Sequence, residues 1–209
     1  MGTSIEGDAM TTATRVLATN FRGTWVRDAV LVAAATSFIA VSAQVAIPLP
    51  FSPVPLTGQT LAVLLTGAAL GTSLGTASIA LYVALALAGM PVLAPTADGL
   101  HNTGAAVLSS PTLGYLVGFF AASAIVGSLA QRGFTRTPGR TVVSMVLGNI
   151  AIYSLGLLWL HHALSASWAN TIAWGLTPFL VGDAVKVALA AGLLPAAWKL
   201  IRYHPYVSR

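Results

Sequence analysis

Asp183 and Lys186 are two charged side chains in an otherwise apolar stretch, PFLVGDAVKVALAAGLLPAAW, near the end of the chain. Between Arg140 and Lys199 the sequence holds no formal charge besides this pair. The two positions are three apart, so on a helix they share one face. A carboxylate accepts hydrogen bonds from N–H groups, and an ammonium donates to carbonyl oxygens or neutralises an acid. The pair therefore suits the binding of a small polar ligand.

Amide and phenol side chains in the other apolar stretches extend this set of polar groups. Gln59 and Asn149 can each donate and accept hydrogen bonds. Tyr82, Tyr115 and Tyr153 each offer an apolar ring with a polar tip. Packing between helices explains any single one of these residues equally well. As a group, they suit a ligand with urea-like or amide-like polarity and an acid group.

A structural ion pair is the plainest alternative for Asp183 and Lys186. Each charge costs about 2.5–3.5 kcal/mol at the middle of a membrane helix, and an apolar pair of the same volume is often as stable as a buried ion pair. Stability alone is therefore a weak reason for the pair. An intramembrane enzyme with Asp183 as general acid or base is a further alternative. It needs a second catalytic group, for which the sequence offers no strong candidate.

Several signatures of catalysis and metal binding are absent from the sequence. It has no cysteine, no Gly-x-x-x-x-Gly-Lys-[Ser/Thr] phosphate loop, no His-Glu-x-x-His zinc motif and no Gly-x-Ser-x-Gly elbow. We therefore expect a protein that is not an enzyme, does not hydrolyse ATP itself and uses no cofactor or metal.

The composition indicates that the charged pair lies within a membrane-spanning segment. Of the 209 residues, 56% are hydrophobic and 7% are charged, whereas ordinary soluble domains contain about 25% charged residues. A bilayer core of about 30 Å needs roughly 20 apolar residues in a helix. We therefore predict an all-α integral membrane protein with six transmembrane helices. They are expected at 27–47, 57–73, 74–90, 112–131, 141–162 and 177–200.

The basic residues predict the orientation of these spans. They fall before the first span, between the fourth and fifth, and after the sixth, which are three places on one side of the membrane. Positive residues mark the cytoplasmic side, so both termini are predicted to be cytoplasmic, with tails at 1–26 and 202–209 flanking a transmembrane domain at 27–201. This topology explains the net charge of +5 without a nucleic-acid partner. The residues are Arg15, Arg22, Arg27, Arg132, Arg136, Arg140, Lys199, Arg202 and Arg209.

Three loops, at about 47–57, 90–112 and 162–177, are then predicted to face outward. Together they hold a single formal charge, Asp98. The sixth span runs from the outside to the inside, so the charged pair near its start lies in its outer half. A site there would collect its ligand from outside the cell.

Small residues recur at four-residue spacing in three places. Such rows let helix backbones approach closely in lipid, and we expect most of them to pack helices within the protein. Docking onto another membrane protein is the alternative. The rows are Ala29, Ala33 and Ser37; Gly67, Gly71 and Gly75; and Gly114 and Gly118.

Two stretches, IPLPFSPVPLTGQTLAVLLTGAALG and PFLVGDAVKVALA, resemble the BioY family, the biotin-binding substrate-capture (S) components of energy-coupling-factor (ECF) transporters. The likeness covers about residues 30–200. It implies a six-helix S-component fold in the bacterial cytoplasmic membrane, with a biotin pocket near the outer face. It also implies that Asp183 and Lys186 contact the ligand and that the segment from Phe51 to Gln59 closes over it.

The loop in the first of these stretches is punctuated by four prolines, Pro48, Pro50, Pro53 and Pro55. Prolines limit the loop's conformations, so closing it over a ligand costs less ordering entropy than closing a free loop. We expect Phe51 and Val54 to form an apolar lid and Gln59 to make a polar contact beneath it. A tight outer turn with no part in binding is the alternative.

The predicted ligand-binding set joins these residues to the polar groups named above. It comprises Asp183, Lys186, Gln59, Tyr115, Asn149, Tyr153, Tyr82, Phe51, Val54, Thr57 and Asn102. The resemblance further implies that the row of Ala29, Ala33 and Ser37 docks onto a transmembrane coupling protein, and that separate ATPase subunits use the ATP. Some family members are reported to work without those partners. An S component for another vitamin and a solo or secondary biotin carrier are the alternatives.

The chain departs from the family pattern in the second outer loop. The family's glycine-rich stretch is replaced by MPVLAPTADGLHNTG, which contains Pro95, Asp98 and His101. Its Gly-Pro-Thr-Gly-Gly-Tyr-Leu is replaced by SPTLGYL. Whether this loop contributes to binding is therefore a question for the structure.

Overall fold

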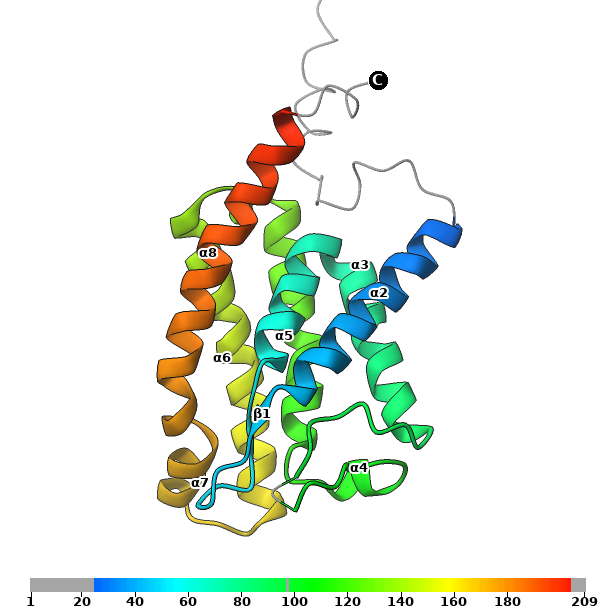
Figure 1. Cartoon of the computed structure of the whole chain (residues 1–209). Helices are drawn as coiled ribbons and strands as arrows, with labels where there is room; N and C mark the ends of the chain where they lie inside the picture. Colours follow the sequence, from blue (N-terminus) through cyan, green and yellow to red (C-terminus); the bar gives the residue numbers. More distant parts are fainter. Residues whose placement is uncertain (1–24, 97, 204–209) are drawn as a thin grey trace, which may run out of the picture.

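The computed structural model describes residues 25–96 and 98–203 and consists almost entirely of helices (Figure 1). Five of the described helices are long and apolar enough to cross a membrane. They are α2 (Trp25–Gln44), α3 (Gln59–Leu87), α5 (Leu113–Gln131), α6 (Pro138–Ala163) and the run Trp168–Leu200, most of which is α8 (Leu180–Tyr203). The shorter elements are β1 (Ala46–Ile47), β2 (Leu56–Thr57), α4 (Ala106–Ser109), η2 (Phe134–Arg136), α7 (Trp168–Gly175) and η3 (Thr177–Phe179).

Helix α3 contains two of the six predicted spans, because it breaks and folds back at Gly71. The backbone there has φ 79° and ψ −176°, a combination that is essentially restricted to glycine. The side chains of Gln59 and Tyr82 approach to 2.6 Å, although 23 residues of straight helix would separate them by about 35 Å. The five membrane-capable helices, one of which folds back on itself, therefore roughly match the six predicted spans. The break at Gly71 lies close to the boundary expected between the spans 57–73 and 74–90.

Close contacts between glycines and neighbouring backbones hold the central helices together. A Cβ atom on Gly67 of α3 would lie 2.9 Å from the carbonyl oxygen of Ser123 on α5. One on Gly118 of α5 would lie 2.8 Å from the Cα atom of Ile152 on α6. Helix α5 thus packs between α3 and α6 at distances that exclude a side chain. The prediction that these small residues pack helices within the protein is confirmed.

Helix α2 packs against α3 through one face and leaves the opposite face uncovered. Thr36, Ile39 and Ala43 are its buried residues, and the Thr36 hydroxyl donates to the carbonyl oxygen of Ser78 at 3.0 Å. The small residues of the first row, Ala29, Ala33 and Ser37, are all exposed. This row therefore makes no buried contact within the described part of the chain.

The two ends of the bundle differ in the elements they carry (Figure 1). The start of α2, the connection between α5 and α6, and the end of α8 lie together at one end. The β1–β2 hairpin, α4 and α7 lie at the other end. This agrees with the predicted sharing of one side by the three basic segments. Apart from their helical ends at 25–26 and 202–203, the predicted tails lie outside the described residues.

Candidate ligand-binding site

A cavity of about 350 Å³ lies at the end of the bundle that carries the hairpin, α4 and α7. Its volume falls within the range of small-molecule pockets, roughly 300–1,000 Å³. Two loops and helices α3, α5, α6 and α8 contribute to its walls. The lining residues are Pro53, Val54, Pro55, Thr57, Gln59, Thr60, Leu93, Ala94, Pro95, Thr96, Asp98, Asn102, Ser110, Pro111, Thr112, Tyr115, Leu116, Phe119, Tyr153, Phe179 and Lys186.

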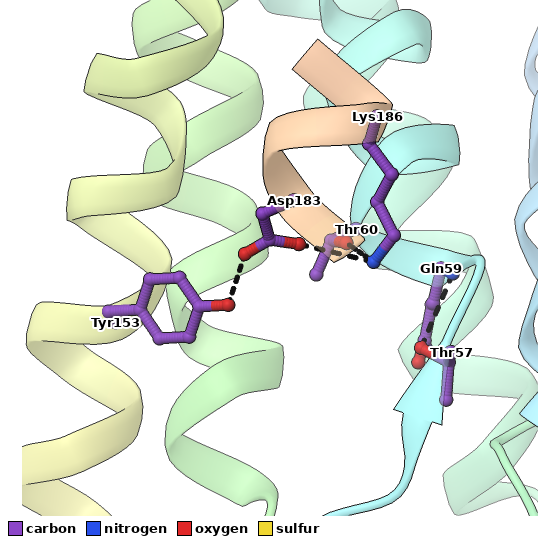
Figure 2. A network of polar contacts seen from close by, with 6 residues as sticks. All are labelled: Thr57, Gln59, Thr60, Tyr153, Asp183 and Lys186. Atoms are coloured by element: carbon purple, nitrogen blue, oxygen red, sulfur yellow. Dashed lines mark hydrogen bonds and ion pairs between the residues drawn. The ribbon is translucent and has the colours of Figure 1, made fainter. Parts of the chain in front are cut away.

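A polar cluster joins three helices beside this cavity (Figure 2). The Lys186 ammonium on α8 donates to the hydroxyl of Thr60 on α3 at 2.8 Å and to Asp183 Oδ1 at 3.2 Å. The Tyr153 hydroxyl on α6 donates to Asp183 Oδ2. Both carboxylate oxygens are thus engaged, and the charges compensate each other in a buried setting. The ammonium has three N–H groups, two of which make these bonds.

The members of this cluster stand in different relations to the cavity. Lys186, Thr60 and Tyr153 line it. Asp183 is 6% exposed and, in the part of the chain that the structure describes, does not line it. It lies on a groove between α6 and α8 instead. The short aspartate side chain turns toward α6, whereas the long lysine side chain reaches α3. In this arrangement Asp183 reaches the cavity only through Lys186 and Tyr153.

Gln59 is held in place from behind by Tyr82. The Gln59 Nε2 group donates to the Tyr82 hydroxyl at 2.6 Å, and that hydroxyl donates to the carbonyl oxygen of Val92 at 3.1 Å. Tyr82 is fully buried and supports Gln59 without being one of the lining residues. The Thr57 hydroxyl accepts from the Gln59 backbone N–H at 3.3 Å (Figure 2), which satisfies one free donor at the start of α3.

Three aromatic rings form one wall of the cavity. Tyr115 and Tyr153 meet edge to face, with ring centroids 6.3 Å apart, and Phe179 lies 6.5 Å from Tyr153. The Tyr115 hydroxyl donates to the carbonyl oxygen of Gly175 at 2.9 Å. Gly156 lets the Tyr115 ring approach α6, since a Cβ atom there would lie 2.5 Å from the ring. Such a wall suits a flat apolar ligand.

The proline loop covers the cavity with part of its length. Val54 is buried and lines the cavity together with Thr57. Phe51 is 60% exposed and is not one of the lining residues. The Ser52 hydroxyl accepts from the Val54 N–H at 3.1 Å and donates to the carbonyl oxygen of Trp174 on α7 at 2.8 Å. The loop is therefore bonded both to itself and to α7.

The second outer loop, whose sequence departs from the family pattern, also contributes to the lining of the cavity. Asn102 lines the cavity, and its Nδ2 group donates to the Ser110 hydroxyl at 3.2 Å. The hydroxyls of Ser110 and Thr112 lie 2.8 Å apart, and the Trp159 indole N–H donates to the Ser110 carbonyl oxygen at 2.8 Å. This corner of the cavity is polar and carries no charge of its own.

Asn149 is a predicted site residue that does not line the cavity. It is placed between a small recess beneath Lys186 and the groove between α6 and α8. Its Oδ1 atom is buried without a hydrogen-bond partner in the described residues. The structure therefore does not bring its amide to the cavity.

Fourteen of the 21 lining residues were not in the predicted set, and they include Thr60, Ser110, Thr112, Phe119 and Phe179. Two of them had a signal in the sequence. Thr60 follows Gln59 directly, and Phe179 stands at the start of the stretch that contains the charged pair. Ser110 and Thr112 had a weaker signal, namely that their segment, SPTLGYL, departs from the family pattern.

Three kinds of comparison with known proteins agree: a family profile, individual relatives and a solved structure. The sequence profile of the BioY family matches residues 10–203. The biotin transporter BioY of Rhizobium etli is 31% identical over 79% of this chain and 89% of its own length. The biotin transporter BioY proteins of Thermotoga maritima and Rhodobacter capsulatus are 36% and 37% identical, over 75% and 77% of this chain and 86% and 85% of their own lengths.

A solved structure adds the fold to this agreement. The S-component for biotin from an ECF-type ABC transporter superposes with a TM-score of 0.72 and 28% identity. The match covers 83% of this chain and 92% of the other. Together with the family profile, it confirms the membrane S-component fold that the sequence predicted. The chain belongs to the BioY family.

Proposed function

We propose that this protein captures biotin from outside the cell and delivers it across the bacterial cytoplasmic membrane. The observation that carries the proposal is a cavity at the hairpin end of a BioY-family bundle, with an aromatic wall and a Lys186–Thr60 pair on its side. Relatives at 31–37% identity are named biotin transporters. The solved neighbour is an S-component for biotin.

Biotin has two polar ends and an apolar middle, and the cavity offers groups for each. The fused rings and aliphatic tail would lie against Tyr115, Tyr153 and Phe179. The remaining N–H of Lys186 would donate to an oxygen of the ligand, either the ureido carbonyl or the carboxylate. Gln59 would supply an amide from α3.

Asp183 has a different role in this proposal from the one first expected. Its two oxygens already accept from Lys186 and Tyr153. A direct bond to a ureido N–H would require it to release one of them. We propose that Asp183 is a positioning residue, which fixes the direction of the Lys186 ammonium and the place of the Tyr153 ring.

Inward release needs a source of energy that this chain does not supply, because it has no phosphate-binding loop for ATP. We propose that an ECF coupling protein and its ATPase subunits provide that energy. The exposed row of Ala29, Ala33 and Ser37 on α2 supports this, since small exposed residues let another membrane helix approach closely.

Equilibrium binding of radiolabelled biotin to the purified protein in detergent tests the proposal. We expect tight binding by the parent and a loss of more than about tenfold, or 1.4 kcal/mol, in Asp183→Asn. Competition with unlabelled vitamins of other classes would show whether biotin is the preferred ligand. A folded preparation that binds no biotin would overturn the proposal. A mutant that keeps full affinity would retain biotin as the ligand and remove Asp183 from the site.

A further inference from the structure

Asp98 is one of two formally charged side chains among the residues that line the cavity, and the other is Lys186. Lys186 is largely buried, with a side-chain exposure of 16%. Asp98 is exposed while also lining the cavity. A residue that touches both the cavity and the solvent lies at its mouth. The mouth therefore has a negative charge, whereas the positive charge of Lys186 in the interior is paired with Asp183.

The turn that carries Asp98 is bonded into the fold. The Thr96 backbone N–H donates to the carbonyl oxygen of Leu100 at 2.7 Å, and the Thr96 hydroxyl oxygen lies 2.8 Å from the same atom. Gly99 closes the turn with φ +78°, a conformation that favours glycine. His101 Nδ1 lies 2.7 Å from the carbonyl oxygen of Leu93. These bonds hold the turn beside the cavity.

The charge on Asp98 is present at neutral pH. Hydrogen bonds from the Thr96 side chain and from its own backbone N–H lower the pKa of this carboxyl below its usual value. It is also the one formal charge in the three outer loops of the sequence. The local field at the mouth is thus dominated by a single negative group.

We propose that the carboxylate of Asp98 slows the passage of a negatively charged ligand through the mouth of the cavity. The inference rests on the proposed function, because biotin has a carboxylate that is ionised at neutral pH. An exposed charge acts through water, so its effect on association falls with added salt.

The association rate constant of biotin tests this inference, measured at about 0.01 M and about 1 M salt, where the Debye length is about 30 Å and 3 Å. At low salt we expect Asp98→Asn to bind biotin about two- to fivefold faster than the parent, the size expected for one exposed charge acting through water. At high salt the two rate constants should converge.

A charge-relocation variant separates the place of the charge from the net charge. Asn170 is exposed on α7, at the same end of the bundle, and does not line the cavity. The double variant Asp98→Asn/Asn170→Asp keeps the net charge and moves the carboxylate away from the mouth. The new aspartate lies in the first turn of α7, where a negative side chain is favourable. We expect the double variant to bind as fast as Asp98→Asn.

Three outcomes would overturn the inference while leaving biotin as the ligand. They are equal rate constants for the parent and Asp98→Asn at low salt, a difference that persists at high salt, and a double variant that returns to the rate of the parent. Failure of the folded parent to bind biotin at all is a separate result. It would overturn the proposed function, and this inference with it.

Discussion

Tyr153 and Asp183 are 30 residues apart in the sequence and are joined by a hydrogen bond between α6 and α8. Tyr153 lines the ligand cavity, while Asp183 lies behind it on the groove between the two helices. The bond therefore links a residue that lines the cavity to the residue that pairs with Lys186. Changing either end of this link should alter binding without removing a contact between Asp183 and the ligand.

Removing the Tyr153 hydroxyl should weaken the site while keeping its aromatic wall. Tyr153→Phe leaves the ring in place and frees one oxygen of Asp183, which is then less firmly held beside Lys186. We expect biotin affinity to fall by about tenfold, since a hydrogen bond to a charged group contributes about 1.5–3 kcal/mol. Titration with radiolabelled biotin measures the effect. Tyr115→Phe is the control, because its hydroxyl bonds a neutral carbonyl oxygen, and unchanged affinity in Tyr153→Phe would contradict the prediction.

Replacing both charges of the buried pair should abolish biotin binding while leaving the stability of the fold nearly unchanged. Asp183→Leu or Lys186→Met alone leaves one buried charge unpaired, which costs about 3–5 kcal/mol. The double variant removes both charges and is expected to unfold near the temperature of the parent. We expect it to bind no biotin. Thermal unfolding in detergent, combined with binding, checks both parts. A double variant that still binds tightly would show that the pair is structural.

The prolines in the loop over the cavity should strengthen biotin binding, because they restrict the loop before the ligand binds. Pro53 and Pro55 line the cavity. Each Pro→Ala change should raise the entropic cost of ordering the loop by about 0.4–1 kcal/mol. We expect the double alanine variant to bind biotin about three- to tenfold more weakly. Isothermal titration would report a larger entropic penalty on binding. Pro91→Ala, an exposed position that does not line the cavity, is the matched control, and equal losses in both variants would contradict the prediction.

A bulky residue in the exposed row of α2 should affect uptake but not binding. Ala33→Trp places a large side chain where close approach by another helix is proposed, while the cavity lies elsewhere. We expect biotin binding by the purified protein to be unchanged and uptake into cells with the complete transport system to fall at least tenfold. Phe38→Trp, on the same helix and already 47% exposed, should leave uptake intact. Normal uptake by Ala33→Trp would exclude this face as the docking surface.

A side chain at the break in α3 should destabilise the whole bundle. Gly71→Ala forces alanine into a backbone conformation that costs about 1–3 kcal/mol, and we expect a lower unfolding temperature in detergent. Gly192→Ala in α8 is the control, because no atom lies within 4 Å of the added Cβ. That change should be neutral or slightly stabilising, as alanine favours helix. Equal midpoints for Gly71→Ala and the parent would contradict the strain described here.

The spans could be predicted from the sequence because hydropathy and length determine them. Their ends shifted by a few residues for local reasons. Helix α6 starts at Pro138 rather than 141 because proline suits the first helical turn. Helix α8 starts at Leu180 rather than 177 because Thr177–Phe179 forms a separate 3-10 turn.

The direction of individual side chains could not be predicted in the same way. In a soluble helix, alternation of polar and apolar residues identifies the buried face, but a lipid-facing helix is apolar all round. Asn149 was therefore expected at the site, although it lies away from the cavity. Lys186 and Asp183 were correctly placed on one helix face, yet their different side-chain lengths send them to different neighbours.

The bond from Ser52 to Trp174 has a mechanical consequence. Helix α7 continues through η3 directly into α8, the helix that bears Lys186. The loop over the cavity and Lys186 in the cavity wall are thus connected, from the proline loop through α7 to α8. To open, the loop has either to break that single bond or to pull α7 along with it. In the second case, the movement that opens the loop also moves the helix that bears Lys186.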